Sequence, residues 1–99
     1  MMRDPEDCRD MAELRESIDR LDRDLVALLA LRARHIDRAI ALKTTSGLPA
    51  RIDARVREVV GNARSEAVAQ GLDPDLVEAL WQRIVEWSIA REEQVLGLR

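Results

Sequence analysis

Apolar residues recur every three or four positions from Met11 to Lys43, which is the spacing of one face of an α-helix. This stripe comprises Met11, Leu14, Ile18, Leu21, Leu25, Leu28 and Ile36. No glycine or proline interrupts it, and good helix formers fill much of the remainder. A helix of about 33 residues is about 48 Å long, whereas a compact domain of about 100 residues has a radius of gyration of only about 13 Å. So long a stripe needs partners along its whole length, and the pattern therefore predicts an intertwined homodimer that shares this helix between two cores.

A cluster of helix-breaking residues ends this first pattern. The cluster consists of Thr44, Thr45, Ser46, Gly47 and Pro49. It predicts that the long helix ends near Lys43 and that a loop continues to about Ala50. The next apolar pattern predicts a second helix over Ile52–Gln70, with Gly71 suited to a left-handed C-terminal cap. The buried face of this helix is expected to comprise Ile52, Val56, Val59, Val60, Ala63 and Ala67.

A third helix is predicted after the dipeptide Asp73-Pro74, which is typical of an N-cap followed by the first helical position. The helix should continue to about Leu96, where Gly97 ends it. Its apolar face is expected to comprise Leu76, Val77, Leu80, Trp81, Ile84, Val85 and Ile89. Near the start of the chain, Pro5–Cys8 predicts a short turn. Since no strand pattern or internal repeat occurs, the fold class is all-α, with three helices per chain and a very long first helix.

Two cations lie on or beside the apolar stripe of the long helix. Arg32 follows Leu28 by four residues and Leu25 by seven, where the stripe predicts another leucine. Lys43 follows Arg32 by eleven residues, only about 20° around the helix. Inward-facing cations are costly unless an anion meets them. Two interpretations stay open: pairing with some of the 19 acidic residues on a neighbouring helix, or a pocket for an anionic ligand.

The composition favours a folded helical chain. Apolar residues make up 46% of the 99 residues and charged residues 35%, which does not fit a disordered protein. Aromatic residues amount to only 2%, so leucine, isoleucine, valine and alanine must form the core. One domain over residues 1–99 is expected. Its small aliphatic core is marginal alone, which again favours a dimer.

Charge and cysteine content exclude several classes of function. The net charge of −3, with basic and acidic residues interspersed, counts against nucleic-acid binding. No apolar run approaches about 20 residues, so no membrane span is expected. Cys8 is the only cysteine, which rules out a disulfide within the chain and a multi-cysteine metal site. With no secretory signal pattern at the N-terminus, we expect a reducing cytoplasm. The Asp19, Asp22 and Asp24 group is interpreted as a solvated face, not a metal site.

The remaining candidates for chemistry are few. Arg15 and Arg32 lie about 25 Å apart along one helix, so they cannot grip one small molecule from the same chain. An antiparallel dimer could bring Arg15 of one subunit toward Arg32 of the other. Ser88 and Glu92 lie one turn apart on the third helix. His35 is isolated, and we interpret it as a partly exposed, hydrogen-bonded side chain rather than a catalytic one.

The chain resembles the all-helical chorismate mutase family over about Met11 to Leu96. The matching segments are Leu14-Arg15-Glu16, Ile18-Asp19, Leu21-Asp22, Leu25-Val26, Leu28-Leu29, Arg32, Lys43, Gly47-Leu48-Pro49, Arg55 and Ile84-Val85-Glu86-Trp87-Ser88. The spacing from Arg15 to Arg32 to Lys43 is specific in combination. The opening Pro5-Glu6-Asp7-Cys8 is similar to the start of the isochorismate-pyruvate lyases of salicylate synthesis, which share this fold.

The resemblance implies an intertwined dimer with two equivalent pockets, each using Arg15 from the opposite chain. Arg15 and Arg32 would hold the two carboxylates of the substrate, as arginine forks do, and Arg55 would add positive charge. Lys43 would donate to the ether oxygen of the breaking C–O bond. Chorismate would become prephenate in one pericyclic step without a cofactor, because the pocket selects the compact conformer and places positive charge at the ether oxygen.

Three positions depart from the family pattern. Glu92 stands where many bacterial members carry a glutamine that donates to the ether oxygen, and a glutamate donates only when protonated. Activity should therefore fall as pH rises, and Glu92→Gln should flatten that profile. Ile52 and Val56 stand where mutases often carry aspartate and glutamate, and that glutamate normally recognises the ring hydroxyl of chorismate. The lyases also carry an apolar residue at the position that Val56 occupies here.

The sequence therefore predicts a homodimeric chorismate mutase that acts on a small dicarboxylate, with neither metal nor cofactor. The predicted catalytic residues are Arg15, Arg32, Lys43 and Glu92, and the predicted substrate-binding residues are Arg55, Ser88, Ile52 and Val56. Two enzyme alternatives stay open: an isochorismate-pyruvate lyase, and a mutase of 4-amino-4-deoxychorismate. A non-catalytic helical dimerisation or regulatory module is the alternative from another class, and it predicts that protein carboxylates neutralise Arg32 and Lys43.

Overall fold

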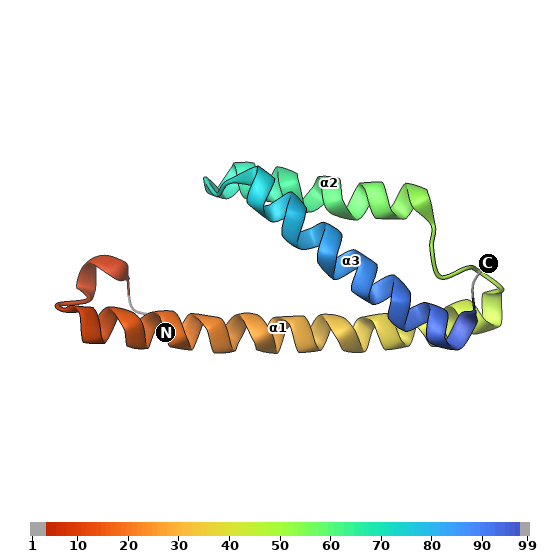
Figure 1. Ribbon diagram of the computed structural model, residues 1–99, viewed down its shortest axis with the longest axis horizontal. Coiled ribbons are helices and arrows are strands. Elements are labelled where there is room, and N and C mark those ends of the chain that lie inside the picture. Colours follow the sequence, from red (N-terminus) through yellow and green to blue (C-terminus); the bar gives the residue numbers. More distant parts are fainter. Residues whose placement is uncertain (1–3, 98–99) are drawn as a thin grey trace. The chain divides into compact units, whose positions relative to one another are not determined.

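The computed structural model describes residues 4–97 and contains three α-helices (Figure 1). A short 3₁₀ turn, η1, is followed by α1, α2 and α3, with bounds Pro5–Asp7, Met11–Ser46, Asp53–Gln70 and Pro74–Leu96. No strand occurs within the described range. The predicted all-α class, with three helices of which the first is by far the longest, is confirmed. The predicted single domain of residues 1–99 extends beyond the described range at both ends and stays a prediction.

Helix α1 ends at Ser46, three residues later than predicted. The hydroxyl groups of Thr44, Thr45 and Ser46 donate to the carbonyl oxygens four residues earlier, at 2.8, 3.4 and 3.0 Å. These polar residues are thus accommodated in the last turn of the helix, with their hydroxyl groups bonded to the preceding turn. The helix stops at Gly47, whose φ of 75° is the left-handed conformation that suits glycine.

The boundaries of α2 and α3 follow their capping residues. Gly71 has φ 72° and its N–H donates to the last turn of α2, as predicted. The Asp73 carboxylate accepts from the backbone N–H of Asp75 at 2.9 Å and of Leu76 at 3.5 Å, while Pro74 is the first residue of α3. Both predicted helix signals are confirmed. Near the start of the chain, the turn η1 also forms, although the side chain of Asp4 makes no capping hydrogen bond.

Asp73→Ala should lower the free energy of unfolding by about 1 kcal/mol, because it removes the acceptor for two backbone N–H groups at the start of α3. Thermal or urea unfolding measures the change. Asp4→Ala is the matched control and should leave stability unchanged, since Asp4 caps nothing through its side chain. Equal stability of the Asp73→Ala variant and the unmodified protein would contradict this role.

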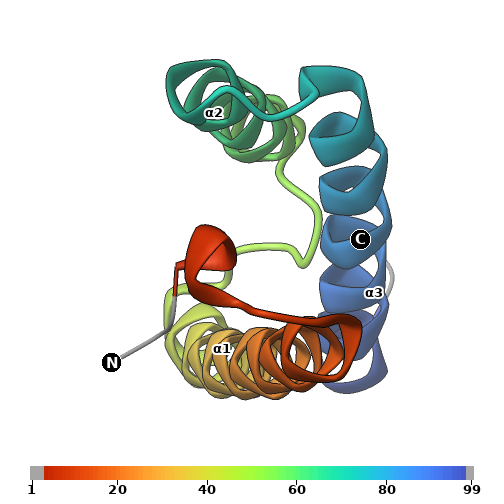
Figure 2. The ribbon, with the colours of Figure 1, turned by 90° about the vertical axis from the view of Figure 1, so that its left-hand side faces the viewer.

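The small core lies where α2 and α3 pack together (Figure 2). Its buried centre comprises Ala50, Val85 and Ile89, against which Val56, Val59, Val60 and Leu96 pack. Val77 and Ala67 are buried closer to the connection between the two helices. Most of the predicted apolar faces are thus confirmed. Leu76 and Leu80 are exceptions, because each remains 49% exposed.

The chain divides between His35 and Ile36 into two units, and α1 runs through both. No residue of α1 is buried in the described chain. Exposed large apolar side chains follow one another along its first part: Met11, Ile18, Leu21, Leu25, Val26, Leu28, Leu29 and Leu31. Most of the apolar stripe predicted from the sequence is therefore uncovered in one chain. No helix in residues 4–97 has the length and apolar character needed to cross a membrane.

Candidate active site

Lys43 and Glu92 form an ion pair between the last turn of α1 and the last part of α3. Lys43 Nζ lies 2.8 Å from Glu92 Oε1. The side chains are only 17% and 7% exposed, respectively. No donor in the described chain is aligned to hydrogen-bond Glu92 Oε1, so its contact with the ammonium group is ionic. The structure therefore brings two of the predicted catalytic residues together, as a buried pair of opposite charges.

The loop after α1 is attached to the same lysine. Lys43 Nζ donates to the carbonyl oxygen of Ala50 at 3.0 Å, and Ala50 is buried. Ser88 lies one turn before Glu92 and is also buried; its hydroxyl donates to the Ile84 carbonyl at 2.9 Å. The site thus consists of three polar side chains in a largely enclosed position, those of Lys43, Ser88 and Glu92. Electrostatic interactions are stronger in such a position than in water.

The two predicted carboxylate-binding arginines belong to the other unit of the chain. Arg15 is exposed, and Arg32 is partly buried on α1. Their convergence with Lys43 stays a prediction. His35 is exposed on the same helix, and its Nδ1 lies 2.9 Å from the Leu31 carbonyl oxygen. This confirms its interpretation as a surface, hydrogen-bonded side chain.

The three predicted substrate-binding residues around the start of α2 differ in environment. Ile52 is the N-cap residue of α2 and is partly buried. Val56 is also partly buried and packs against the core. Arg55 is exposed and pairs with Glu58 one turn further along α2. The charged partner of Arg55 is thus Glu58 and not a member of the Lys43–Glu92 pair.

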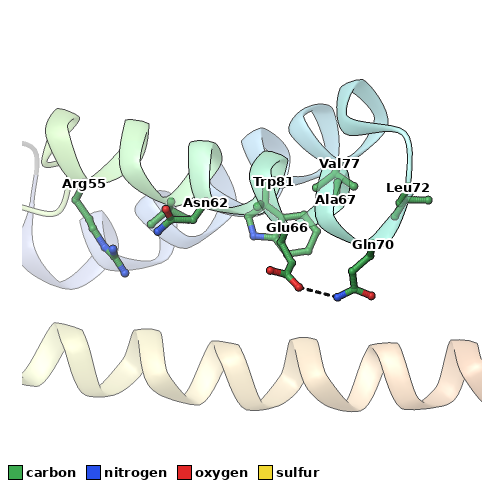
Figure 3. Close-up of a pocket in the computed structure, with 10 residues that line it drawn as sticks. Arg55, Asn62, Glu66, Ala67, Gln70, Leu72, Val77 and Trp81 are labelled. Carbon is green, nitrogen blue, oxygen red and sulfur yellow. Dashed lines mark hydrogen bonds between the residues drawn. The ribbon is translucent and has the colours of Figure 1, made fainter.

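A groove of about 600 Å³ runs between α2 and α3 (Figure 3). Of the predicted site residues, only Arg55 lines it. Its floor is apolar, with Ala67, Val77 and Trp81, while Glu66 and Gln70 are joined at the rim by a hydrogen bond of 2.8 Å. The described residues contain no group of three or more metal-ligating side chains.

Sequence reasoning missed two ion pairs beside the site. Arg91 on α3 donates to both carboxylate oxygens of Asp37 on α1, at 2.6 and 3.0 Å. Arg51 in the loop donates to both oxygens of Glu86 on α3, at 3.0 and 2.6 Å. These hydrogen bonds hold the pKa values of Asp37 and Glu86 below the usual range. The partners are 54 and 35 residues apart, so no local spacing could have indicated either pair.

Residues 14–93 match the chorismate mutase type II family, and this match spans most of the chain. The chain belongs to this family. The predicted family resemblance is therefore confirmed.

Similar proteins carry two different names. The chain is 36% identical over 92 residues to an isochorismate pyruvate lyase of Pseudomonas aeruginosa, covering 92% of this chain and 89% of the lyase. It is 32% identical over 83 residues to a T-protein of Enterobacter agglomerans and 33% identical over 84 residues to that of Haemophilus influenzae. The chain spans only 22% of the length of each T-protein. These similarities agree with the family assignment.

Proposed function

We propose that the protein is a chorismate mutase that rearranges chorismate to prephenate in a pocket shared between two subunits. The buried Lys43–Glu92 pair carries this proposal. The ammonium group of Lys43 can donate to the ether oxygen, and Glu92 beside it would add a second donor only in a protonated form. The family membership supports the same reaction class.

In the proposed reaction the C–O bond of the ether breaks while a C–C bond forms within the same molecule, so nothing leaves and no proton is transferred. Lys43 donates to the ether oxygen as negative charge develops there. Donors fixed in a water-poor site stabilise such charge more than water does, since they need no reorganisation. Arg15 of the opposite chain and Arg32 bind the two carboxylates and hold the substrate in its compact conformer.

A second copy of the chain is the proposed cover for two surfaces. One is the apolar stripe of α1, where Leu25 and Leu28 are 57% and 62% exposed. The other is the groove between α2 and α3 with its apolar floor. Exposed apolar surface on this scale is typical of an interface. The proposed homodimer buries the stripe of each subunit against the other and allows Arg15 to reach the pocket of the partner.

Isochorismate-pyruvate lyase activity is the second candidate. Val56 supports it, because an apolar side chain cannot hydrogen-bond the ring hydroxyl by which chorismate differs from isochorismate. The identity of 36% to the P. aeruginosa lyase over nearly its whole length also supports it. Glu92 favours the mutase, since a second donor at the ether oxygen serves the rearrangement. The third candidate substrate is 4-amino-4-deoxychorismate, the amino analogue of chorismate.

The test is incubation of the purified protein with chorismate, isochorismate and 4-amino-4-deoxychorismate in separate reactions. We expect prephenate from chorismate, at a higher kcat/KM than turnover of either other substrate. If the protein instead converts isochorismate to salicylate and pyruvate faster than it converts chorismate, the proposed mutase activity is wrong and the lyase activity is supported. No turnover of any of the three would favour a non-catalytic module, for which Glu92 merely neutralises Lys43.

Glu92→Gln should not lower the turnover of chorismate, because the amide of glutamine can donate a hydrogen bond to the ether oxygen. Glu92→Ala should lower turnover, since no polar side chain then stands beside Lys43 at that oxygen. Initial rates of the two purified variants, measured at one pH, give both effects. Equal turnover in the two variants would remove hydrogen-bond donation at this position from the mechanism.

A further inference from the structure

Two ion pairs join the C-terminal part of α1 to α3. The inner one is the buried Lys43–Glu92 pair at 2.8 Å. The outer one is the exposed Asp37–Arg91 pair, with two parallel hydrogen bonds of 2.6 and 3.0 Å. Arg91 and Glu92 are consecutive residues of α3, while Asp37 precedes Lys43 by six residues, about 9 Å along α1. The two contacts are therefore separated along α1, and together they fix how α1 approaches this part of α3.

Arg91 is held in place from two sides. Its guanidinium group forms a fork on Asp37 and also lies over the ring of Trp87, 5.4 Å from the ring centre. Arginine is suited to both contacts, because its planar group binds a carboxylate bidentately and stacks on an aromatic face. The hydrogen bonds from Arg91 lower the pKa of Asp37 further below neutral pH, which is consistent with a stable charged contact. The outer pair is thus a geometrically defined contact and not a loose surface ion pair.

No residue of α1 is fully buried in this approach, although Ile36, Ala39 and Ile40 are partly buried. Within residues 4–97, no residue of α1 belongs to the buried core or to the apolar side chains packed against it. The core is made by α2, α3 and the loop residue Ala50. The hydrogen bonds between Asp37 and Arg91 add a directional contact to this approach, and hydrogen bonds constrain geometry more tightly than apolar packing does.

Substrate binding would affect the inner pair and not the outer one. When Lys43 and Glu92 turn to the ether oxygen, their direct attraction is replaced by contacts with the substrate. The hydrogen bonds of the outer pair involve neither Lys43 nor Glu92, so binding of a substrate to those two residues would leave the outer pair intact.

We propose that Asp37 and Arg91 are positioning residues, which hold Lys43 and Glu92 at the separation that the reaction requires. This inference rests on the proposed function. Because Lys43 and Glu92 act on the ether oxygen, and Arg15 and Arg32 on the carboxylates, loss of the outer pair lowers kcat much more than it raises KM. A purely structural role would instead lower stability and leave the kcat of the folded fraction unchanged.

Asp37→Asn and Arg91→Gln should each lower kcat about 10-fold or more, because a displacement of about 1 Å can cost about 10²-fold, with KM changed less than about threefold. The double variant Asp37→Arg/Arg91→Asp restores the opposite charges in exchanged places and should recover most of the lost kcat. The matched control is Arg64→Gln, which breaks the exposed pair of Arg64 with Asp75 at the other end of α3. It should leave kcat and KM unchanged. Equal loss of kcat in the control and the test variants would overturn the proposal, as would unchanged kcat in Asp37→Asn and Arg91→Gln.

A second readout does not depend on turnover, because Lys43 is the only lysine in the sequence. In protein labelled with ¹⁵N-lysine, a single ζ-ammonium signal reports on the Lys43 contact. This signal should weaken and shift toward that of free lysine in Asp37→Asn and Arg91→Gln, and stay in place in Arg64→Gln. An unchanged signal in the two test variants would overturn the positioning role. If the unmodified protein turned over none of the three substrates, the proposed function would fail, while this signal would still decide whether the outer pair positions Lys43.

Discussion

Lys43→Met should lower kcat/KM for chorismate by about 10³-fold, the effect of removing a principal donor from a site where negative charge develops. Lys43 Nζ is the cation of the buried Lys43–Glu92 pair, and methionine matches the length of the lysine stem without its charge. Arginine at this position should also be poorly active, because its planar fork cannot place a single donor where the ammonium group stands. Steady-state rates with purified variants measure both effects.

The same substitution also changes stability, and the two effects have to be separated. In Lys43→Met the Glu92 carboxylate remains buried without its counter-ion, which should cost about 3 kcal/mol of unfolding free energy. The double variant Lys43→Met/Glu92→Gln removes this unpaired charge and should regain most of the stability. It should remain inactive, because the donor is still absent. Recovery of turnover together with stability in the double variant would show that Lys43 supports the fold and not the reaction.

The helices could be predicted from the sequence because their signals are local. Asp73 caps α3 and Gly71 ends α2 through contacts within a few residues, and both were read from residue type and order. The end of α1 was predicted wrongly for a related reason. Thr44 and Ser46 are typical of turns, yet both lie in the last turn of the helix, where their hydroxyl groups donate to carbonyl groups of the preceding turn.

The candidate site was predicted less completely. Lys43 stood out because a cation on an apolar stripe needs an anion, and the structure supplies Glu92 as that anion. The fork between Asp37 and Arg91 could not be predicted, because many exposed acidic and basic residues are available and only the folded geometry selects the partners. Arg15 posed a different difficulty: its predicted role requires a second subunit, so one chain leaves it exposed.

Mixing two inactive variants should restore activity if each pocket draws on both subunits. Arg15→Ala and Arg32→Ala should each lower turnover by about 10²-fold or more, because each removes one bidentate carboxylate contact that orients the substrate. Both should stay folded, since neither arginine belongs to the described core. Far-UV circular dichroism and gel filtration of each variant check the fold and the oligomeric state.

After subunit exchange, half of the dimers are mixed, and each mixed dimer carries one pocket with both arginines intact and one that lacks both. The mixture should therefore reach about one quarter of the activity of the unmodified protein. A mixture of Arg15→Ala with the double variant Arg15→Ala/Arg32→Ala is the control, because no combination of these chains contains both arginines in one pocket. Exchange is followed independently with differently tagged subunits. If activity does not recover despite complete exchange, or recovers no more than in the control mixture, Arg15 and Arg32 do not act together in a pocket shared between the subunits.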